Sequence, residues 1–286
     1  MNQKVIDLYD EFTHGGMERR EFLERLAQLA GSSAAAVALL PLLQNDYASA
    51  QIVPENDDRL NISRVEYDAA GAKLSGYLAR LKAGGKRPAV IVIHENRGLN
   101  PHIQDVTRRM AVEGFLALGP DMLSPLGGTP ADQGEATKMI GSLNPAETVA
   151  RLAATVKYLA SHPESTGKVG VVGFCWGGGM ANRLAAAGTS LNAAVPYYGS
   201  QIPESEVPKI TAPLLLHYAS LDQRINAGIA AYEAALKANN KPYEMHMYEG
   251  ANHAFNNDTN AARYSKEAAD LAWSRTVAFF KKNLSP

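Results

Sequence analysis

The 286-residue sequence contains a single cysteine, Cys175. That count excludes an intramolecular disulfide framework and any zinc site built from several cysteines. Basic residues are not in excess, because 28 lysines and arginines stand against 29 aspartates and glutamates. A formal net charge of −1 argues against electrostatic binding of nucleic acid, so we expect no such partner. With 46% hydrophobic and 20% charged residues, the chain has enough core-forming side chains for a globular enzyme.

The first 50 residues differ in character from the rest. They carry an arginine pair at 19–20, Phe-Leu at 22–23, an uncharged stretch at 26–45 and the small-residue sequence Ala-Ser-Ala at 48–50. This order resembles a twin-arginine export signal, which predicts a periplasmic or exported protein; if the signal is not used, the protein would be cytoplasmic. The alternative is a retained amphipathic helix, starting at Arg20, that packs on the main domain or on a second subunit. Pro41 and several polar residues make a poor transmembrane span, so no stable membrane anchor is expected.

The remaining chain divides into a polar connector, residues 51–60, and one domain, residues 61–286. Two short strands, Ile62–Tyr67 and Leu74–Leu81, are expected to pair antiparallel. Further strands are expected at 88–94, 115–119, 168–174, 193–198, 213–218 and 243–248, and helices at 102–113, 146–162, 177–187, 225–238 and about 261–282. This alternation predicts an α/β fold with a mostly parallel central sheet and helices on both faces. In such folds, ligands bind at the carboxyl ends of the strands.

The cysteine lies in a strand-to-helix turn. Gly173-Phe174-Cys175-Trp176-Gly177 fits the pattern Gly-x-nucleophile-x-Gly, with cysteine in place of the commoner serine. Such a turn is strained, and it places the sulfur at a helix N-terminus, where the helix dipole favours a thiolate. The backbone N–H of Trp176 is then a candidate for one half of an oxyanion hole. The alternative is a buried structural cysteine in a tightly packed turn.

Two candidate partners follow the cysteine in the order nucleophile, acid, histidine. Asp222 comes after the strand expected at 213–218, and His253 comes after the strand expected at 243–248. His253 would take the proton of Cys175 and later activate water, while Asp222 would fix the imidazole tautomer. Taken singly, Asp222 is equally a helix N-cap, and His253 is equally an ordinary loop histidine.

A fourth group of candidates follows the strand at 88–94. Glu95 would lie close to the nucleophile and hold the thiol through a hydrogen bond, and the backbone N–H of Asn96 would complete the oxyanion hole. Arg97, Arg224 and Tyr198 are candidate substrate contacts. His94, His102, His217 and His253 show no H-E-x-x-H or H-x-H spacing, so no metal site is expected.

Together, these residues resemble the dienelactone hydrolase family over about residues 60–286. The resemblance rests on the cysteine turn, on Asp222 and His253 in this order, and on Glu95 after the first long strand. It implies a single-domain α/β-hydrolase fold, no cofactor, and hydrolysis of an enol-lactone through a thioester. It also implies a thiol that is held against Glu95 until substrate binding releases it toward His253.

The sequence departs from the family pattern at two positions that would bind a substrate carboxylate. Asn257 stands where the resemblance leads us to expect an arginine, four positions after His253, and residues 120–126 contain no arginine. Arg97 or Arg224 could replace them, but a neutral ester or lactone is an equally good candidate substrate. The Gly/Pro/Thr-rich loop 123–145 is expected to act as a lid or pocket wall. A non-catalytic ligand-binding homologue and an acyltransferase remain alternatives, and a monomer and a homodimer are both open.

Overall fold

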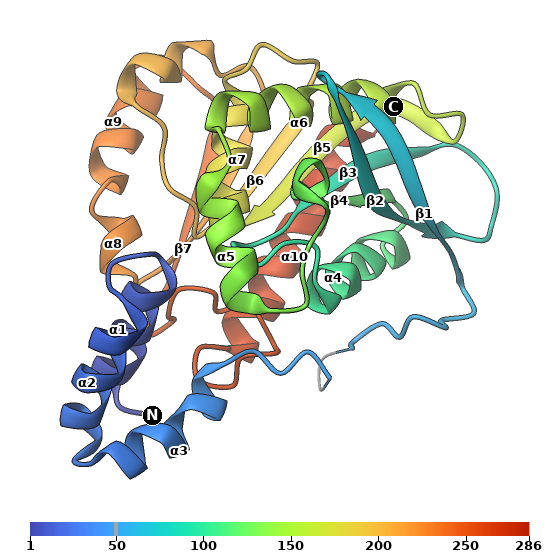
Figure 1. The fold of residues 1–286 in the computed structure, drawn as a ribbon. Coiled ribbons are helices and arrows are strands. Elements are labelled where there is room, and N and C mark those ends of the chain that lie inside the picture. The colour runs from blue at the N-terminus through green and yellow to red at the C-terminus, as the bar shows by residue number, and fades with distance from the viewer. Residues whose placement is uncertain (49–50, 286) are drawn as a thin grey trace.

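The structure is a computed structural model that describes residues 1–48 and 51–285 (Figure 1). Within these residues, eight strands form one sheet in the order β1-β2-β4-β3-β5-β6-β7-β8. The strands are β1 (Leu60–Ala69), β2 (Ala72–Leu81), β3 (Arg87–Ile93), β4 (Leu116–Pro120), β5 (Ser165–Phe174), β6 (Ala193–Tyr197), β7 (Leu214–Ala219) and β8 (Tyr243–Tyr248). The β1–β2 and β2–β4 pairs are antiparallel, and all the other pairs are parallel. The predicted α/β architecture with a mostly parallel sheet is therefore confirmed.

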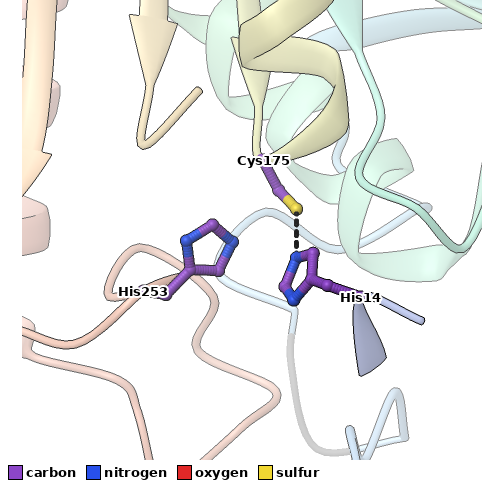
Figure 2. Close-up of side chains that lie close together, drawn as sticks. All are labelled: His14, Cys175 and His253. Atoms are coloured by element: carbon purple, nitrogen blue, oxygen red, sulfur yellow. Dashed lines mark hydrogen bonds between the residues drawn. The ribbon is translucent and has the colours of Figure 1, made fainter. Parts of the chain in front are cut away.

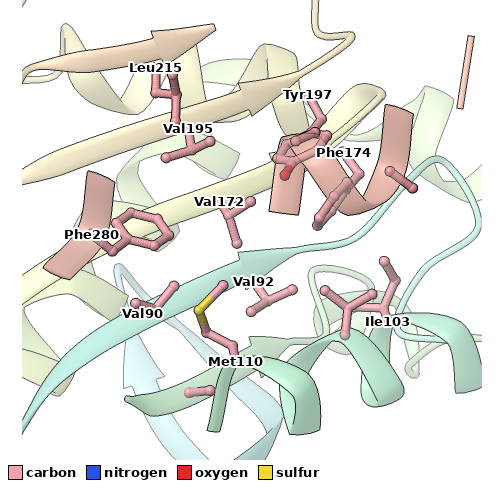
Figure 3. Packing of buried hydrophobic residues seen from close by; sticks show 14 of the residues in the cluster. Val90, Val92, Ile103, Met110, Val172, Phe174, Val195, Tyr197, Leu215 and Phe280 are labelled. Atoms are coloured by element: carbon pink, nitrogen blue, oxygen red, sulfur yellow. The ribbon is translucent and has the colours of Figure 1, made fainter. Parts of the chain in front are cut away.

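The helices of the main domain cover both faces of this sheet. They are α4 (Pro101–Val112), α5 (Gln133–Ser142), α6 (Pro145–Ala160), α7 (Trp176–Ala185), α8 (Gln223–Asn226), α9 (Ile229–Ala238) and α10 (Lys266–Leu284), with 3-10 turns η1 (Ser124–Leu126) and η2 (Glu204–Lys209). On one face, α4 and α10 pack on Val90, Val92 and Val172, as Figure 3 shows. On the other face, α6 and α7 pack on Ile91 and Val171, and α9 contributes Tyr232 and Leu236 to the same apolar cluster. Successive side chains of a strand point to opposite faces, so a strand that is buried on both faces needs the continuous apolar run found in β3.

The structure differs from the expected boundaries in three places. The last helix begins at Lys266 rather than near residue 261, because residues 250–264 form a chain of tight turns. The helix expected at 225–238 is split at Gly228 into α8 and α9. The loop expected at 123–145 contains a helix of its own, α5, whose N-cap Asp132 accepts a hydrogen bond of 2.7 Å from the backbone N–H of Glu135. Aspartate three positions before glutamate is a helix-start signal that the Gly/Pro-rich surroundings conceal.

The first 43 residues form three helices, which we call the arm: α1 (Gln3–Thr13), α2 (Arg19–Ala30) and α3 (Ser33–Leu43). They share a small core that includes Leu8, Phe22 and Leu26. In Figure 1 the blue helices of the arm gather at one end of the sheet, next to α8. The prediction of a single helix starting at Arg20 is therefore wrong, because the segment forms three helices. The prediction that this segment packs on the main domain agrees with the structure. Residues 49 and 50 of the expected Ala-Ser-Ala cleavage site lie outside the described residues.

The hydropathy of the helices bears on membrane insertion. Among the described residues, no single helix combines the length and the apolar character that a membrane span requires. Helices α2 and α3 reach that threshold only when taken together, and they meet at a bend of 108°.

Candidate active site

Cys175 occupies the tight turn between β5 and α7, at the carboxyl end of the sheet. Its backbone has φ 56° and ψ −115°, a left-handed φ that costs free energy for any residue other than glycine. Glycines on both sides make the turn sterically possible: a Cβ at Gly173 would lie 2.0 Å from the carbonyl oxygen of Gly177, and one at Gly177 would lie 2.5 Å from that of His94. The sulfur is thus held at the N-terminus of α7 by backbone geometry.

His253 and Asp222 lie beside this turn as a hydrogen-bonded pair. The Nδ1 atom of His253 is 2.5 Å from Oδ2 of Asp222, and both side chains are buried. The other oxygen of Asp222 accepts a hydrogen bond of 3.2 Å from the backbone N–H of Ile225 at the start of α8. Asp222 is therefore a helix N-cap and the partner of His253 at the same time, so its two interpretations are not exclusive. The Nε2 atom of His253 has no hydrogen-bond partner among the described residues.

The sulfur of Cys175 is contacted by a residue of the arm. The Nε2 atom of His14 lies 3.2 Å from Sγ, and its Nδ1 atom lies 2.7 Å from the backbone carbonyl oxygen of Asp10. Figure 2 shows His14 and His253 approaching Cys175 from two sides. Their rings are nearly perpendicular, at 87°, with centroids 4.9 Å apart. No motif or spacing in the sequence points to His14, which lies in the segment that resembles an export signal.

Several polar contacts fix the arm across the site. The side-chain N–H of Asn96 donates to the carbonyl oxygen of Thr13 at 2.8 Å, and Arg97 donates to the hydroxyl of Tyr9 at 3.1 Å. At the start of α1, Gln3 donates to Asn252, the residue before His253, at 2.5 Å. Arg97 is buried beneath the arm and is engaged there, which argues against its expected role in binding a substrate carboxylate.

Asp10 forms an electrostatic contact between the arm and the main domain. Its carboxylate lies 3.5 Å from nitrogens of Arg224 and Arg263. Burial raises the pKa of Asp10, but the positive groups around it, first His253 and His14 and then the two arginines, outweigh burial and lower the pKa to about 2. Asp10 is therefore ionised at neutral pH, and the buried Arg263 has a charged partner.

The same surroundings favour a thiolate–imidazolium pair. Burial raises the pKa of Cys175, but the positive charges of His253 and His14 and the hydrogen bond between His14 and the sulfur lower it to about 5. Burial lowers the pKa of His253, but Asp222, Asp10 and Cys175 raise it well above its ordinary value. Each charge is thus stabilised by its neighbours, as in other cysteine sites where a histidine activates the sulfur.

Glu95 does not hold the thiol in this structure. Its Oε2 atom accepts a hydrogen bond of 2.7 Å from the side-chain N–H of Asn257, and its Oε1 atom is buried without a partner among the described residues. The expectation that the thiol rests against Glu95 is therefore not met, because His14 is the hydrogen-bond partner of the sulfur among the described residues. Asn257, which replaces the expected arginine, supplies the amide that binds the carboxylate.

A cavity of about 300 Å³ lies against the sulfur. Its walls combine the arm, the main domain and the segment that we expected to act as a pocket wall, which contributes Thr137 and Ile140 of α5. Trp176, Tyr198 and Arg224 also line it, so two of the three expected substrate contacts face this space. Tyr198 has a positive φ of 36° and a buried hydroxyl with no partner within the described part of the chain, a polar group that is available to a ligand.

The contact between Asp10 and the arginines yields a prediction about the arm. Asp10→Asn removes the charge that balances buried Arg263, so the arm should open more often. We expect the amides of α1 to exchange with deuterium roughly tenfold faster, which peptide-level mass spectrometry would measure. Glu11→Gln is the matched control, because Glu11 is exposed and pairs with Arg25 inside the arm. Equal exchange rates in the wild-type chain and Asp10→Asn would mean that this ion cluster does not hold the arm.

Comparison with known proteins agrees with the motif and the fold. Residues 74–284 match the dienelactone hydrolase family, and residues 1–31 match a separate family described as YqhI-like. The match at 1–31 gives no support to the expected export signal. A protein of Escherichia coli O157:H7 named "Putative carboxymethylenebutenolidase" is 31% identical over 247 residues, which cover 81% of this chain and 90% of that protein. "Protein usf" of Aquifex pyrophilus is 34% identical over 230 residues, covering 77% and 98% respectively.

A solved structure extends this similarity to three dimensions. The crystal structure of a protein titled "Putative Dienelactone Hydrolase" from Klebsiella pneumoniae superposes with a TM-score of 0.71 at 30% identity. The superposition covers 78% of this chain and 99% of the other. The predicted α/β-hydrolase fold is thereby confirmed.

Proposed function

Because the chain belongs to the dienelactone hydrolase family, we propose that it hydrolyses a carboxylic ester or lactone through a thioester on Cys175. The observation that carries this proposal is the arrangement at the carboxyl end of the sheet. A sulfur held at a helix N-terminus lies beside an imidazole whose Nδ1 atom is bound by Asp222 at 2.5 Å. This set supplies a nucleophile, a proton carrier and a group that orients the carrier, which are the parts that acyl transfer requires.

In the first half of the reaction, the thiolate of Cys175 attacks the carbonyl carbon of the substrate. The negative charge that develops on the carbonyl oxygen would be bound by the backbone N–H groups of Trp176 and Asn96. The carbon–oxygen bond to the leaving group then breaks. The imidazolium of His253 gives its proton to the departing oxygen, and the acyl group remains on sulfur.

In the second half, water replaces the leaving group. Neutral His253 removes a proton from water, the resulting hydroxide attacks the thioester carbon, and the carboxylic acid leaves as sulfur regains its negative charge. Asp222 holds Nδ1 throughout, so Nε2 stays directed toward the sulfur. Esters and lactones with good leaving groups suit this chemistry better than amides, because a thiolate expels a weak base more easily than an amine.

The pocket indicates a small and mostly apolar acyl group. A cavity of about 300 Å³ beside the sulfur accommodates only a compact substrate while the arm is in place. Arg224 is the one arginine among the described lining residues, and it already faces Asp10. We therefore propose a short-chain ester or lactone that does not depend on a paired-arginine clamp.

Trapping the acyl intermediate tests this proposal directly. Acid quenching during turnover of p-nitrophenyl acetate, followed by digestion and mass spectrometry, should show one acetyl group on the peptide that contains Cys175. Neutral hydroxylamine should remove it, since thioesters react with this amine. An unmodified Cys175 peptide during rapid turnover would contradict a thioester mechanism.

The lowered pKa of Cys175 predicts an unusual pH profile for its alkylation. A thiolate that persists down to a pKa of about 5 should react with iodoacetamide at a nearly constant rate from neutral pH downward, then lose reactivity as the pH falls through about 5. His14→Ala removes one cause of the shift and should move the midpoint upward. The urea-unfolded chain is the control, because its only cysteine should titrate near an ordinary value of about 8.5. The same midpoint in the folded chain would rule out the ion pair.

A further inference from the structure

We propose that Cys175, His14 and His253 together bind a thiophilic divalent cation such as Zn²⁺, with the arm supplying one of the three ligands. One donor atom from each residue lies within 4.8 Å of the other two, and the structure contains no ion. Figure 2 shows the two imidazoles converging on the sulfur from different parts of the chain, the C-terminal end of α1 and the loop after β8. The arm therefore completes a donor set that the main domain alone cannot form.

The spacing of the donors is close to that of a tetrahedral zinc site. Zinc bonds of about 2.3 Å to sulfur and about 2.0–2.1 Å to nitrogen place neighbouring ligand atoms roughly 3.3–3.7 Å apart. The Nε2 atom of His14 already lies 3.2 Å from Sγ of Cys175. The donor atom of His253 lies no more than 4.8 Å from the other two donor atoms. It therefore needs to move toward them by no more than about 1.3 Å to reach the same range.

The orientation of the two imidazoles is the strongest argument for a ligand. In metal sites, a histidine ligand usually donates its second ring N–H to a carboxylate or a backbone carbonyl. His253 has Asp222 at its Nδ1 atom, and His14 has the carbonyl oxygen of Asp10 at its Nδ1 atom. In both rings, this leaves Nε2 for the centre of the cluster. His253 is 4% exposed, and its Nε2 atom has no hydrogen-bond partner within the described residues.

Two of the three other buried histidines, His94 and His217, lack this orientation. The third, His102, has Asp258 at its Nδ1 atom at 3.0 Å, but it belongs to no group of three close donor atoms among the described residues. His94 has the carbonyl oxygen of Glu95 at one ring nitrogen and the backbone N–H of Met122 at the other. His217 lies between the hydroxyls of Thr276 and Tyr248. Neither the His94 ring nor the His217 ring has a free nitrogen for a cation.

The chemistry of the donors selects the kind of cation. One thiolate and two imidazoles suit Zn²⁺, whereas Mg²⁺ and Ca²⁺ prefer oxygen ligands. The cavity of about 300 Å³ adjoins the cluster and leaves room for water as a fourth ligand. A sulfur bound to the cation is not available to attack a carbonyl carbon, so the metal-bound form would be inactive. Because His14 is the C-cap of α1, the cation would also connect the arm to the main domain.

Cobalt binding to the full-length, metal-free protein tests the site without any assay of hydrolysis. Co²⁺ should bind at one equivalent, with a thiolate-to-cobalt charge-transfer band and the strong visible bands of tetrahedral cobalt. Zn²⁺ should displace Co²⁺, abolish both bands and protect Cys175 from iodoacetamide. A cobalt spectrum without the charge-transfer band would overturn the proposal, whether or not the protein proves to be a hydrolase.

Variants separate this site from unspecific binding to a reactive cysteine. His14→Ala and His14→Gln should weaken zinc affinity by roughly tenfold or more, since loss even of an outer partner of a ligand costs that much. Cys175→Ser should lose the charge-transfer band. His246→Gln is the matched control, because His246 is a half-buried histidine on β8 outside the cluster, and it should keep the wild-type affinity. Circular dichroism confirms that each variant is folded. Wild-type zinc affinity in folded His14→Ala or His14→Gln would show that the arm supplies no ligand.

Discussion

Replacing Cys175 by alanine should lower kcat for p-nitrophenyl acetate by about 10³-fold or more, the scale observed when a catalytic nucleophile is removed. The substitution deletes the one atom that forms the acyl bond and leaves the rest of the pocket in place. Alanine carries the same Cβ as cysteine, so the left-handed backbone at φ 56° is no more strained in the variant. Initial rates and a thermal melt on the same preparation would separate loss of chemistry from loss of fold.

Two further variants sharpen this test. His253→Ala removes the proton carrier and should lower the rate by a comparable factor. The double variant with Cys175→Ala should be no worse than either single variant, because residues that act as a unit are not additive. Gln104→Ala changes a half-buried side chain of α4 that does not line the cavity beside the sulfur, so it should retain the wild-type rate. Full activity in Cys175→Ala would mean that another group attacks the ester.

The grouping of Cys175, Asp222 and His253 could be predicted from the sequence because each residue directly follows a strand. Parallel strands place their carboxyl ends at one edge of a sheet, so the order of strands and motifs is enough to bring such residues together. The glycines around Cys175 identify the turn itself, because only glycine fits where two backbone segments approach each other this closely. For these three residues, the order of strands and motifs in the sequence is sufficient to predict that their side chains lie close together.

The contribution of the arm could not be predicted in this way. His14 reaches Cys175 through docking of one folded unit on another, and no periodicity or spacing within residues 1–50 encodes that contact. The arginine pair and the uncharged stretch are also compatible with helices α2 and α3, which is why a leader and a folded arm were difficult to separate. The ion pairs of Asp10 could not be predicted either, because its partners Arg224 and Arg263 lie more than 200 positions away in the sequence.

The hydrogen-bond partner of Glu95 also could not be predicted from the sequence. Its proximity to the nucleophile was inferred from its place directly after the strand at 88–94, and such a position in the sequence does not specify which group the side chain binds. Asn257 is an amide that donates to Glu95, and His14 takes the place beside the sulfur. A single departure from the family pattern at position 257 thus coincides with a different arrangement around a neighbouring carboxylate.

A second large effect is expected at Gly199, where β6 ends against the first turn of α7. An added Cβ would lie 2.2 Å from the carbonyl carbon of Gly178 and 2.5 Å from the backbone nitrogen of Gly179. Both neighbours are backbone atoms of the helix that carries the nucleophile, so no side chain can rotate away. Gly199→Ala should therefore lower the free energy of unfolding by about 3 kcal/mol or more, because overpacking at a rigid contact displaces the backbone.

The same displacement links stability to catalysis. For a chain of this size, a loss of about 3 kcal/mol corresponds to a drop of roughly 6–12 °C in Tm. Shifting the start of α7 also moves the sulfur relative to His253, so kcat should fall even at temperatures where Gly199→Ala is folded. Gly84→Ala is the matched control, since an added Cβ there meets no atom within 4 Å. If Gly199→Ala melted at the wild-type temperature, the close contact between Gly199 and α7 would not be a constraint on the fold, and the rigid placement of Cys175 that follows from it would be wrong.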